Sequence, residues 1–222
     1  MKTNGKQYVW DFFEDLKKNN SKDWMDENRK RYHTAKQYWL DEVEAILERL
    51  SQHDPFFKQF GPKDVIMRIT NNRMFHKDKP IYRTNFSCAP FTREEKISKI
   101  FFSFGPEFTI IGSGLYRPEK DVLQSVREAI DYDAQELLDI LSENKFQKLY
   151  GGLAPDEHQL KRVPKGFPKD HPNVELLRRK SFNAHLKPSP EKLIKGSLPD
   201  IIEEAFVAAL PLVKWLEKAT SV

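Results

Sequence analysis

The sequence predicts a single α+β domain over residues 1–222, with an antiparallel or mixed sheet of about four to six strands packed against amphipathic helices. Apolar residues recur at helical spacing at both ends of the chain, whereas short β-branched or aromatic segments bounded by turn residues occupy its middle. The chain also lacks repeats, low-complexity tracts and any clear interdomain linker.

The amino-terminal part predicts two amphipathic helices. The first has its apolar side chains at i, i+3, i+4 and i+7, namely Val9, Phe12, Phe13 and Leu16. Residues 17–20 end it, and Ser21 is a suitable amino-terminal cap for a second helix whose apolar face runs from Trp24 to residue 51. Residues 53–63 contain two prolines and a glycine, so we expect a connector there.

The middle of the chain predicts the sheet. Three segments are short, apolar and bounded by turn residues: 65–70, 99–104 and 108–112. The last two predict a hairpin around Gly105 and Pro106, and a further strand is expected at residues 181–186. Residues 112–114, Gly-Ser-Gly, are interpreted as a tight turn from strand to helix.

The remaining elements are mostly helical. Pro118 is suited to the first turn of a helix that continues to residue 130, and residues 134–150 predict another helix or a broken pair. A long ordered loop is expected over residues 151–172, followed by a helical turn at 174–179. An amphipathic helix over 198–219, kinked or broken near Pro211, ends the chain.

The cysteine and hydropathy patterns predict a cytoplasmic protein. The single cysteine, Cys88, excludes an internal disulfide and is interpreted as a small core residue. The amino terminus lacks the apolar stretch of a signal peptide, and no run reaches the ~18 to 20 apolar residues of a membrane span. The six histidines show no metal-ligand spacing, so we expect neither a metal nor a cofactor.

Two basic, proline-punctuated segments carry the functional signal. Residues 68–86 hold five Lys or Arg against Asp78 alone, and residues 161–182 hold seven against Asp170 and Glu175. Residues 119–160 between them hold ten acids against four Lys or Arg. This uneven distribution predicts a basic cleft where the two segments converge on an anion.

The cleft is predicted to contain seven ligand-binding residues: Lys79, Tyr82, Arg83, Arg117, Lys165, Lys169 and His171. Lysine and arginine suit phosphate or carboxylate groups, and Arg117 precedes a helix whose dipole already favours negative charge. Two structural alternatives stay open. The cations of the first segment could instead pair with the acidic helices, and Asp170 could cap the following turn with His171 packed against it.

The leading hypothesis is therefore a protein that binds an anionic small molecule or a nucleic acid. One alternative is an enzyme that acts on a phosphate-containing or nucleic-acid substrate, with Asp78, Asp170 or His171 transferring protons. Another is an interaction module whose basic face docks an acidic protein. Neither catalytic residues nor an oligomeric state can be assigned from the residues alone.

Four stretches also resemble one family: FFEDLKKNNSKDWMDENRKRY, HKDKPIYRTNF, IGSGLYRPEKDVLQSVREAI and LKRVPKGFPKDHPNVELLRRKSF. In order, and together with the AALPLVKWL helix, they resemble the family catalogued as domain of unknown function 2461 over nearly the whole chain. The resemblance implies an α+β domain and carries no assigned activity. Asn71 and Asn72 stand where that family usually has an Arg-Asp pair.

Overall fold

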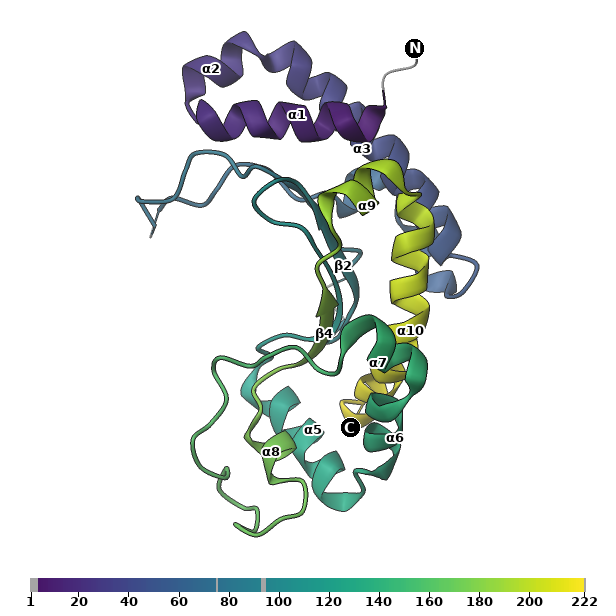
Figure 1. Ribbon diagram of the computed structural model, residues 1–222. Helices are drawn as coiled ribbons and strands as arrows, with labels where there is room; N and C mark the ends of the chain where they lie inside the picture. The colour runs from purple at the N-terminus through teal and green to yellow at the C-terminus, as the bar shows by residue number, and fades with distance from the viewer. Residues whose placement is uncertain (1–3, 75, 93–94, 222) are drawn as a thin grey trace. The chain divides into compact units, whose positions relative to one another are not determined.

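The computed structural model describes residues 4–74, 76–92 and 95–221. The described chain is α+β, with helices and one antiparallel sheet whose four strands follow the order β1-β2-β3-β4 (Figure 1). These strands are β1 (Phe86–Cys88), β2 (Ser98–Phe104), β3 (Ile110–Leu115) and β4 (Phe182–Leu186). The predicted fold class and the hairpin around Gly105 and Pro106 are confirmed.

The chain divides into two compact units. Leaving aside the residues that the structure does not describe, unit 1 comprises Met1–Pro90, Phe101–Ile111 and Lys187–Glu204. Unit 2 comprises Phe91–Ile100, Gly112–Leu186 and Ala205–Val222. A single domain over the whole chain stays a prediction.

Unit 1 is built on aromatic packing. Its helices are α1 (Gly5–Lys18), α2 (Lys22–Glu27), α3 (Arg29–Leu50), the 3-10 helix η1 (Pro55–Gln59), α4 (Pro62–Val65) and α9 (Pro190–Lys195), with the first turns of α10 (Leu198–Ala219). Helix α1 lies against α3 (Figure 1). The ring of Trp39 in α3 stacks on Phe86 and Phe104, which face each other across β1 and β2. Each of these large buried rings contributes a large apolar area to the core of this unit.

Unit 2 has its own apolar core. Its helices are α5 (Lys120–Tyr132), α6 (Gln135–Ser142), α7 (Asn144–Tyr150) and α8 (Val174–Arg178), with the later turns of α10. The predicted broken pair over residues 134–150 is confirmed, as are the long loop before α8 and the strand β4. Val126 of α5, Phe146 of α7 and Leu216 of α10 are buried together in the core. Helix α10 is continuous through Pro211.

The structure corrects the second predicted helix. Residues 22–50 form two helices, α2 and α3, which are separated at Asn28. The side-chain amide of Asn28 donates a hydrogen bond to the carbonyl of Trp24, 2.9 Å away, and its backbone N–H donates to the same oxygen. Asparagine competes for backbone groups in this way and favours helix ends. The predicted cap at Ser21 is confirmed, because its hydroxyl accepts the N–H of Trp24.

One strand prediction and one turn prediction also need correction. Residues 65–70 do not form a strand: Val65 ends a short helix that begins at Pro62, and Ile66 and Thr70 form only isolated bridges, with Cys88 and Tyr82. Residues 112–114 are not a turn but the interior of β3. A Cβ at Gly114 would lie 2.5 Å from the carbonyl oxygen of Phe182, so glycine is needed for the close approach of β4.

Candidate anion-binding loops

The first basic segment forms a loop that is fixed at its base. Thr70 and Tyr82 form an antiparallel bridge, and the N–H of Arg83 donates to the carbonyl of Ile69. The side chain of Asn20, between α1 and α2, accepts the N–H of Tyr82 at 2.9 Å and donates to its carbonyl at 2.8 Å. The backbone on which Tyr82 and Arg83 stand is therefore held from both sides.

The cations of this loop are not neutralised within the described chain. Five of them form no ion pair with a described carboxylate: Arg68, Arg73, Lys77, Lys79 and Arg83. Arg83 is half-buried and its Nε donates to the side chain of Asn71 at 3.3 Å, whereas Lys77 and Lys79 are exposed. The alternative that these groups pair with acidic helices has no support among the described residues.

The second loop is anchored by a carboxylate. One oxygen of Asp156 accepts the backbone N–H groups of Lys180 and Ser181, and its other oxygen accepts the N–H of His158. The amino-terminal end of the loop is thereby joined to the residues that lead into β4. A carboxylate that accepts several backbone N–H groups is a strong, directional anchor.

A buried arginine, Arg127, and a half-buried one, Arg179, hold the carboxyl-terminal end of the loop. Arg127 of α5 is only 8% exposed, and its guanidinium donates to the carbonyls of Leu177 and Arg179. Arg179 in turn donates to the carbonyls of Ser181 and Ala154. Burial lowers the pKa of both guanidiniums, and the charge of Asp156 partly offsets this for the pKa of Arg179.

His171 also has a structural environment. Its Nδ1 accepts the backbone N–H of Asn173 at 3.0 Å, so the ring proton lies on Nε2, which faces a carboxylate oxygen of Asp131 at 3.4 Å. The side chain is only 9% exposed. It is His171, rather than Asp170, that bonds to the turn before α8. Both ring nitrogens are thus engaged within unit 2, and a ligand role for His171 stays a prediction.

Lys165 and Lys169 differ from these buried groups. Both are exposed, and neither forms an ion pair within the part of the chain that the structure describes. Gly166, between them, has φ of 95°, a left-handed conformation that directs the chain through a sharp turn. The loop therefore presents two unpaired ammonium groups between ends that Asp156, Arg127 and Arg179 hold in place.

Arg117 is the remaining predicted ligand-binding cation in unit 2. It has φ of 47°, a left-handed conformation that is uncommon for a residue with a Cβ. Its side chain is exposed, and its backbone N–H donates to the hydroxyl of Ser181 at 3.1 Å. Arg117 is therefore held beside the Lys180–Ser181 pair. Lys180 is not among the seven ligand-binding residues predicted from the sequence, although the predicted strand at 181–186 begins directly after it.

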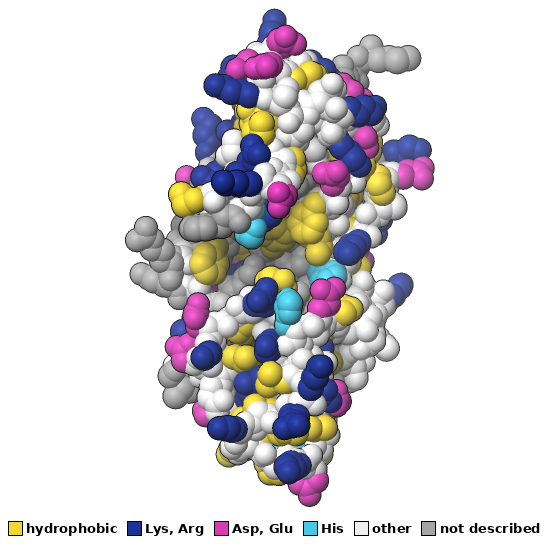
Figure 2. Space-filling view, turned by 90° about the vertical axis from the view of Figure 1, so that its left-hand side faces the viewer, with side chains coloured by type: hydrophobic (Ala, Val, Ile, Leu, Met, Phe, Trp, Pro, Cys, Tyr) yellow, Lys and Arg dark blue, Asp and Glu magenta, His cyan; other side chains and the backbone are white. Residues whose placement is uncertain are grey.

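The predicted residues fall in different units. Lys79, Tyr82 and Arg83 belong to unit 1, whereas Arg117 and the loop with Lys165 and Lys169 belong to unit 2. That all of them line one cleft stays a prediction. The face of unit 2 that carries the loop is turned toward the viewer in Figure 2, where Lys and Arg side chains recur across the surface rather than gather at one point.

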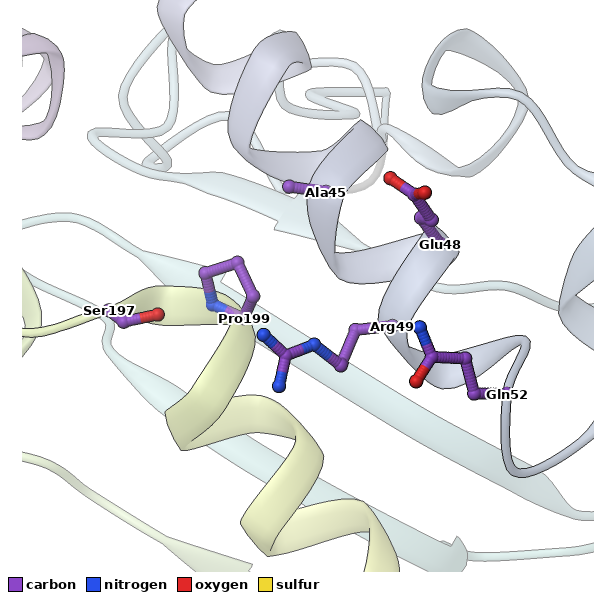
Figure 3. A pocket seen from close by; sticks show the side chains of 6 residues that line it. All are labelled: Ala45, Glu48, Arg49, Gln52, Ser197 and Pro199. Atoms are coloured by element: carbon purple, nitrogen blue, oxygen red, sulfur yellow. The ribbon is translucent and has the colours of Figure 1, made fainter.

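A pocket of about 310 Å³ lies elsewhere in unit 1, between the last turns of α3 and the start of α10 (Figure 3). Arg49 projects from α3 toward Ser197 and Pro199 in Figure 3, and it forms ion pairs with Asp200 at 3.1 Å and Glu203 at 2.7 Å. These carboxylates already neutralise its charge. Arg49 therefore joins α3 to α10 and is not an unpaired cation for an anion in this pocket.

Other chemistry has little support among the described residues. No group of three or more His, Cys, Asp or Glu in this part of the chain could hold a metal ion. Cys88 is buried, and desolvation raises the pKa of its thiol to about 12, so the predicted core role is confirmed. None of the described helices combines the length and apolarity needed to cross a membrane.

One known family matches nearly the whole chain. Residues 8–215 match the family described as "Conserved hypothetical protein (DUF2461)". The chain belongs to the DUF2461 family. The match confirms the resemblance seen in the four sequence stretches. The described part of this DUF2461 chain is α+β. No curated protein and no solved structure matches the chain.

Proposed function

We propose that this DUF2461 protein binds the phosphate backbone of a nucleic acid through the exposed cations of its two loops. One observation carries the proposal. Hydrogen bonds hold both loops at their ends, while Lys77, Lys79, Lys165 and Lys169 are exposed without an ion pair to any described carboxylate. Loops anchored at their ends have less conformational freedom to lose when they bind an anion.

The exposure of these groups favours an extended polyanion over an enclosed small ligand. Small-molecule sites bury most of their ligand in a concave, largely apolar pocket. Here the lysines stand on exposed loops, and further Lys and Arg recur across the visible face of unit 2 (Figure 2). Repeated phosphates can contact such scattered cations one by one, without base-specific recognition.

Binding of a fluorescein-labelled oligonucleotide, followed by anisotropy over a range of salt concentrations, tests the proposal. We expect affinity to fall linearly on a logarithmic scale as salt rises, because each phosphate contact releases a counterion. Replacing one contacting lysine, in Lys79→Ala, Lys165→Ala or Lys169→Ala, should reduce the slope by about 0.7 to 0.9. Affinity should fall similarly for unrelated sequences.

Lys218→Ala is the matched control. Lys218 is as exposed as the loop lysines but pairs with Glu136 at 3.0 Å, so its loss should leave the slope unchanged. Binding that is insensitive to salt would contradict the proposal. Saturable binding of one small phosphate compound would instead support a pocket, turnover of phosphoesters would support the enzyme, and selective capture of an acidic protein would support the interaction module.

A further inference from the structure

The pairing of β3 with β4 places the exposed residues Tyr116 and Arg117 opposite Lys180 at the ends of these strands in unit 2. A Cβ on Gly112 would lie 3.1 Å from the carbonyl oxygen of Ala184, and one on Gly114 would lie 2.5 Å from that of Phe182. The two strands are antiparallel, so each residue further along β3 meets one further back along β4. Residues 116–117 therefore lie opposite residues 180–181.

A hydrogen bond confirms this register beyond the ends of the strands. The N–H of Arg117 donates to the hydroxyl of Ser181 at 3.1 Å, and Ser181 is 4% exposed. The N–H of Ser181 is itself bound by the carboxylate of Asp156. Arg117 is the one residue other than glycine with positive φ in the described chain. An unfavourable conformation persists only where its surroundings hold it, and such residues cluster at functional sites.

Tyr116 lies directly before Arg117 and two residues after Gly114. It is 70% exposed, in contrast to the buried rings of both cores. Gly114, two residues earlier, and Arg117, the next residue, both have positive φ. These two backbone conformations fix the direction of the chain on either side of Tyr116. Arg117 and, across the strand end, Lys180 form no ion pair with a described carboxylate. The solvent-facing ring of Tyr116 has no evident role in packing, and Arg117 is exposed while Lys180 is half-buried.

We infer that Tyr116, Arg117 and Lys180 bind one nucleotide unit of a single-stranded nucleic acid. The base stacks on the ring of Tyr116, and its flanking phosphates contact the guanidinium of Arg117 and the ammonium of Lys180. An aromatic platform flanked by cations suits single strands, because a base within a duplex has both faces covered by its neighbours. This inference rests on the proposed nucleic-acid function and specifies its substrate class.

The experiment compares one labelled single strand with a duplex of the same sequence. For the single strand, Tyr116→Leu should weaken binding about tenfold, because stacking on an aromatic contributes that order of affinity. Its salt slope should stay that of the wild type, since no cation is lost. Tyr116→Phe should retain wild-type affinity. Duplex binding should change in neither variant.

Tyr132→Leu is the matched control, because Tyr132 lies at the end of α5 in the same unit and is 94% exposed. It should bind the single strand like the wild type. Arg117→Gln and Lys180→Gln should each reduce the salt slope for the single strand, whereas Tyr116→Leu should not. Circular dichroism and thermal melting check that each variant is folded.

The outcomes separate this inference from the proposed function. If Tyr116→Leu binds the single strand as tightly as the wild type, stacking is refuted while a salt-dependent affinity would still support phosphate binding. Equal losses in Tyr116→Leu and Tyr132→Leu would likewise overturn the inference. If the wild type binds neither strand nor duplex with salt dependence, both proposals fail.

Discussion

Basic side chains have different roles in this chain, depending on whether their surroundings leave them solvated or bury them. Lys79 and Lys165 are exposed on loops without an ion pair to a described carboxylate, whereas Arg127 is buried and bonded to two backbone carbonyls. A solvated charge adds little to folding stability, but a buried charge organises the backbone around it. Mutation should therefore separate the two kinds of residue.

Lys79→Ala and Lys165→Ala should each leave the free energy of unfolding within about 0.5 kcal/mol of the wild type, or raise it slightly. Neither side chain is buried, and neighbouring cations repel one another. Denaturant unfolding of the two variants measures this. A loss of about 3 kcal/mol or more in both would show that these lysines are structural and would refute their assignment as ligand groups.

Arg127→Met should lower the free energy of unfolding by about 2 to 4 kcal/mol, because it leaves the carbonyls of Leu177 and Arg179 without their donors. Arg162→Met, at an exposed loop arginine, is the control and should change stability by no more than about 0.5 kcal/mol. Urea unfolding of both variants provides the comparison. Similar small effects in both would mean that water replaces the Arg127 guanidinium at no cost.

At the scale of elements, close strand pairing and ion pairs between helices hold local geometry. Gly114 allows β4 to approach β3, and Glu203 in α10 accepts hydrogen bonds from Arg49 and His53 at the end of α3. Replacing Gly114 or Glu203 tests each feature separately.

Gly114→Ala should destabilise the protein by about 3 kcal/mol or more, because the new Cβ meets the carbonyl of Phe182 in addition to the strain of a φ of 107°. Gly166→Ala has a similar strained φ of 95° but nothing within 4 Å of its Cβ, so it should cost only about 1 kcal/mol. Thermal or urea unfolding measures both. Equal losses would mean that backbone conformation alone, rather than strand approach, requires Gly114.

The ion pairs around Glu203 should make stability depend on acidity. The hydrogen bond from His53 and then the bonds and charge of Arg49 lower the pKa of Glu203 from its usual 4.5. A carboxyl with a lower pKa in the folded state contributes stability above its unfolded pKa and loses it as pH falls through the folded value. Glu203→Gln should therefore be less stable than the wild type at neutral pH, with the difference shrinking below pH 4.5. Urea unfolding at a series of pH values measures this difference, and one that persists unchanged at low pH would contradict the assignment.

At the scale of the whole molecule, basic residues and potential metal ligands are distributed differently along the chain. The net charge is +4, and the two segments with an excess of basic over acidic residues, 68–86 and 161–182, belong to different units. The six histidines are scattered through the sequence, and the described residues form no metal-binding group. This arrangement suits surface contact with an anion better than a buried metal centre.

The purified protein should accordingly carry no stoichiometric transition metal, and chelation should leave its melting temperature unchanged. Elemental analysis and thermal melting with and without chelator measure this. One tightly held zinc or iron per chain, with a fall in melting temperature on its removal, would overturn the expectation.

Local patterns were sufficient to predict much of the fold. The apolar period of α1 and of α10 repeats over several turns, so the helix boundaries follow closely from residues such as Phe12, Leu16 and Ile202. Helix α9 was missed although Ser189 and Pro190 mark its start. The separation of α2 from α3 was also missed. It depends on the side-chain bond of one asparagine, Asn28, whereas the apolar pattern of the sequence continues through this position.

The sequence by itself determined the fold class, most helices and the existence of two basic segments, because helical period and charge are properties of neighbouring residues. Only the tertiary structure decided that Gly112 and Gly114 lie within a strand, that Arg127 is buried and that Arg117 is bonded to Ser181, beside Lys180. Each of these depends on residues far away in the chain. Burial, pairing and exposure are set by packing between distant segments, which no local pattern encodes.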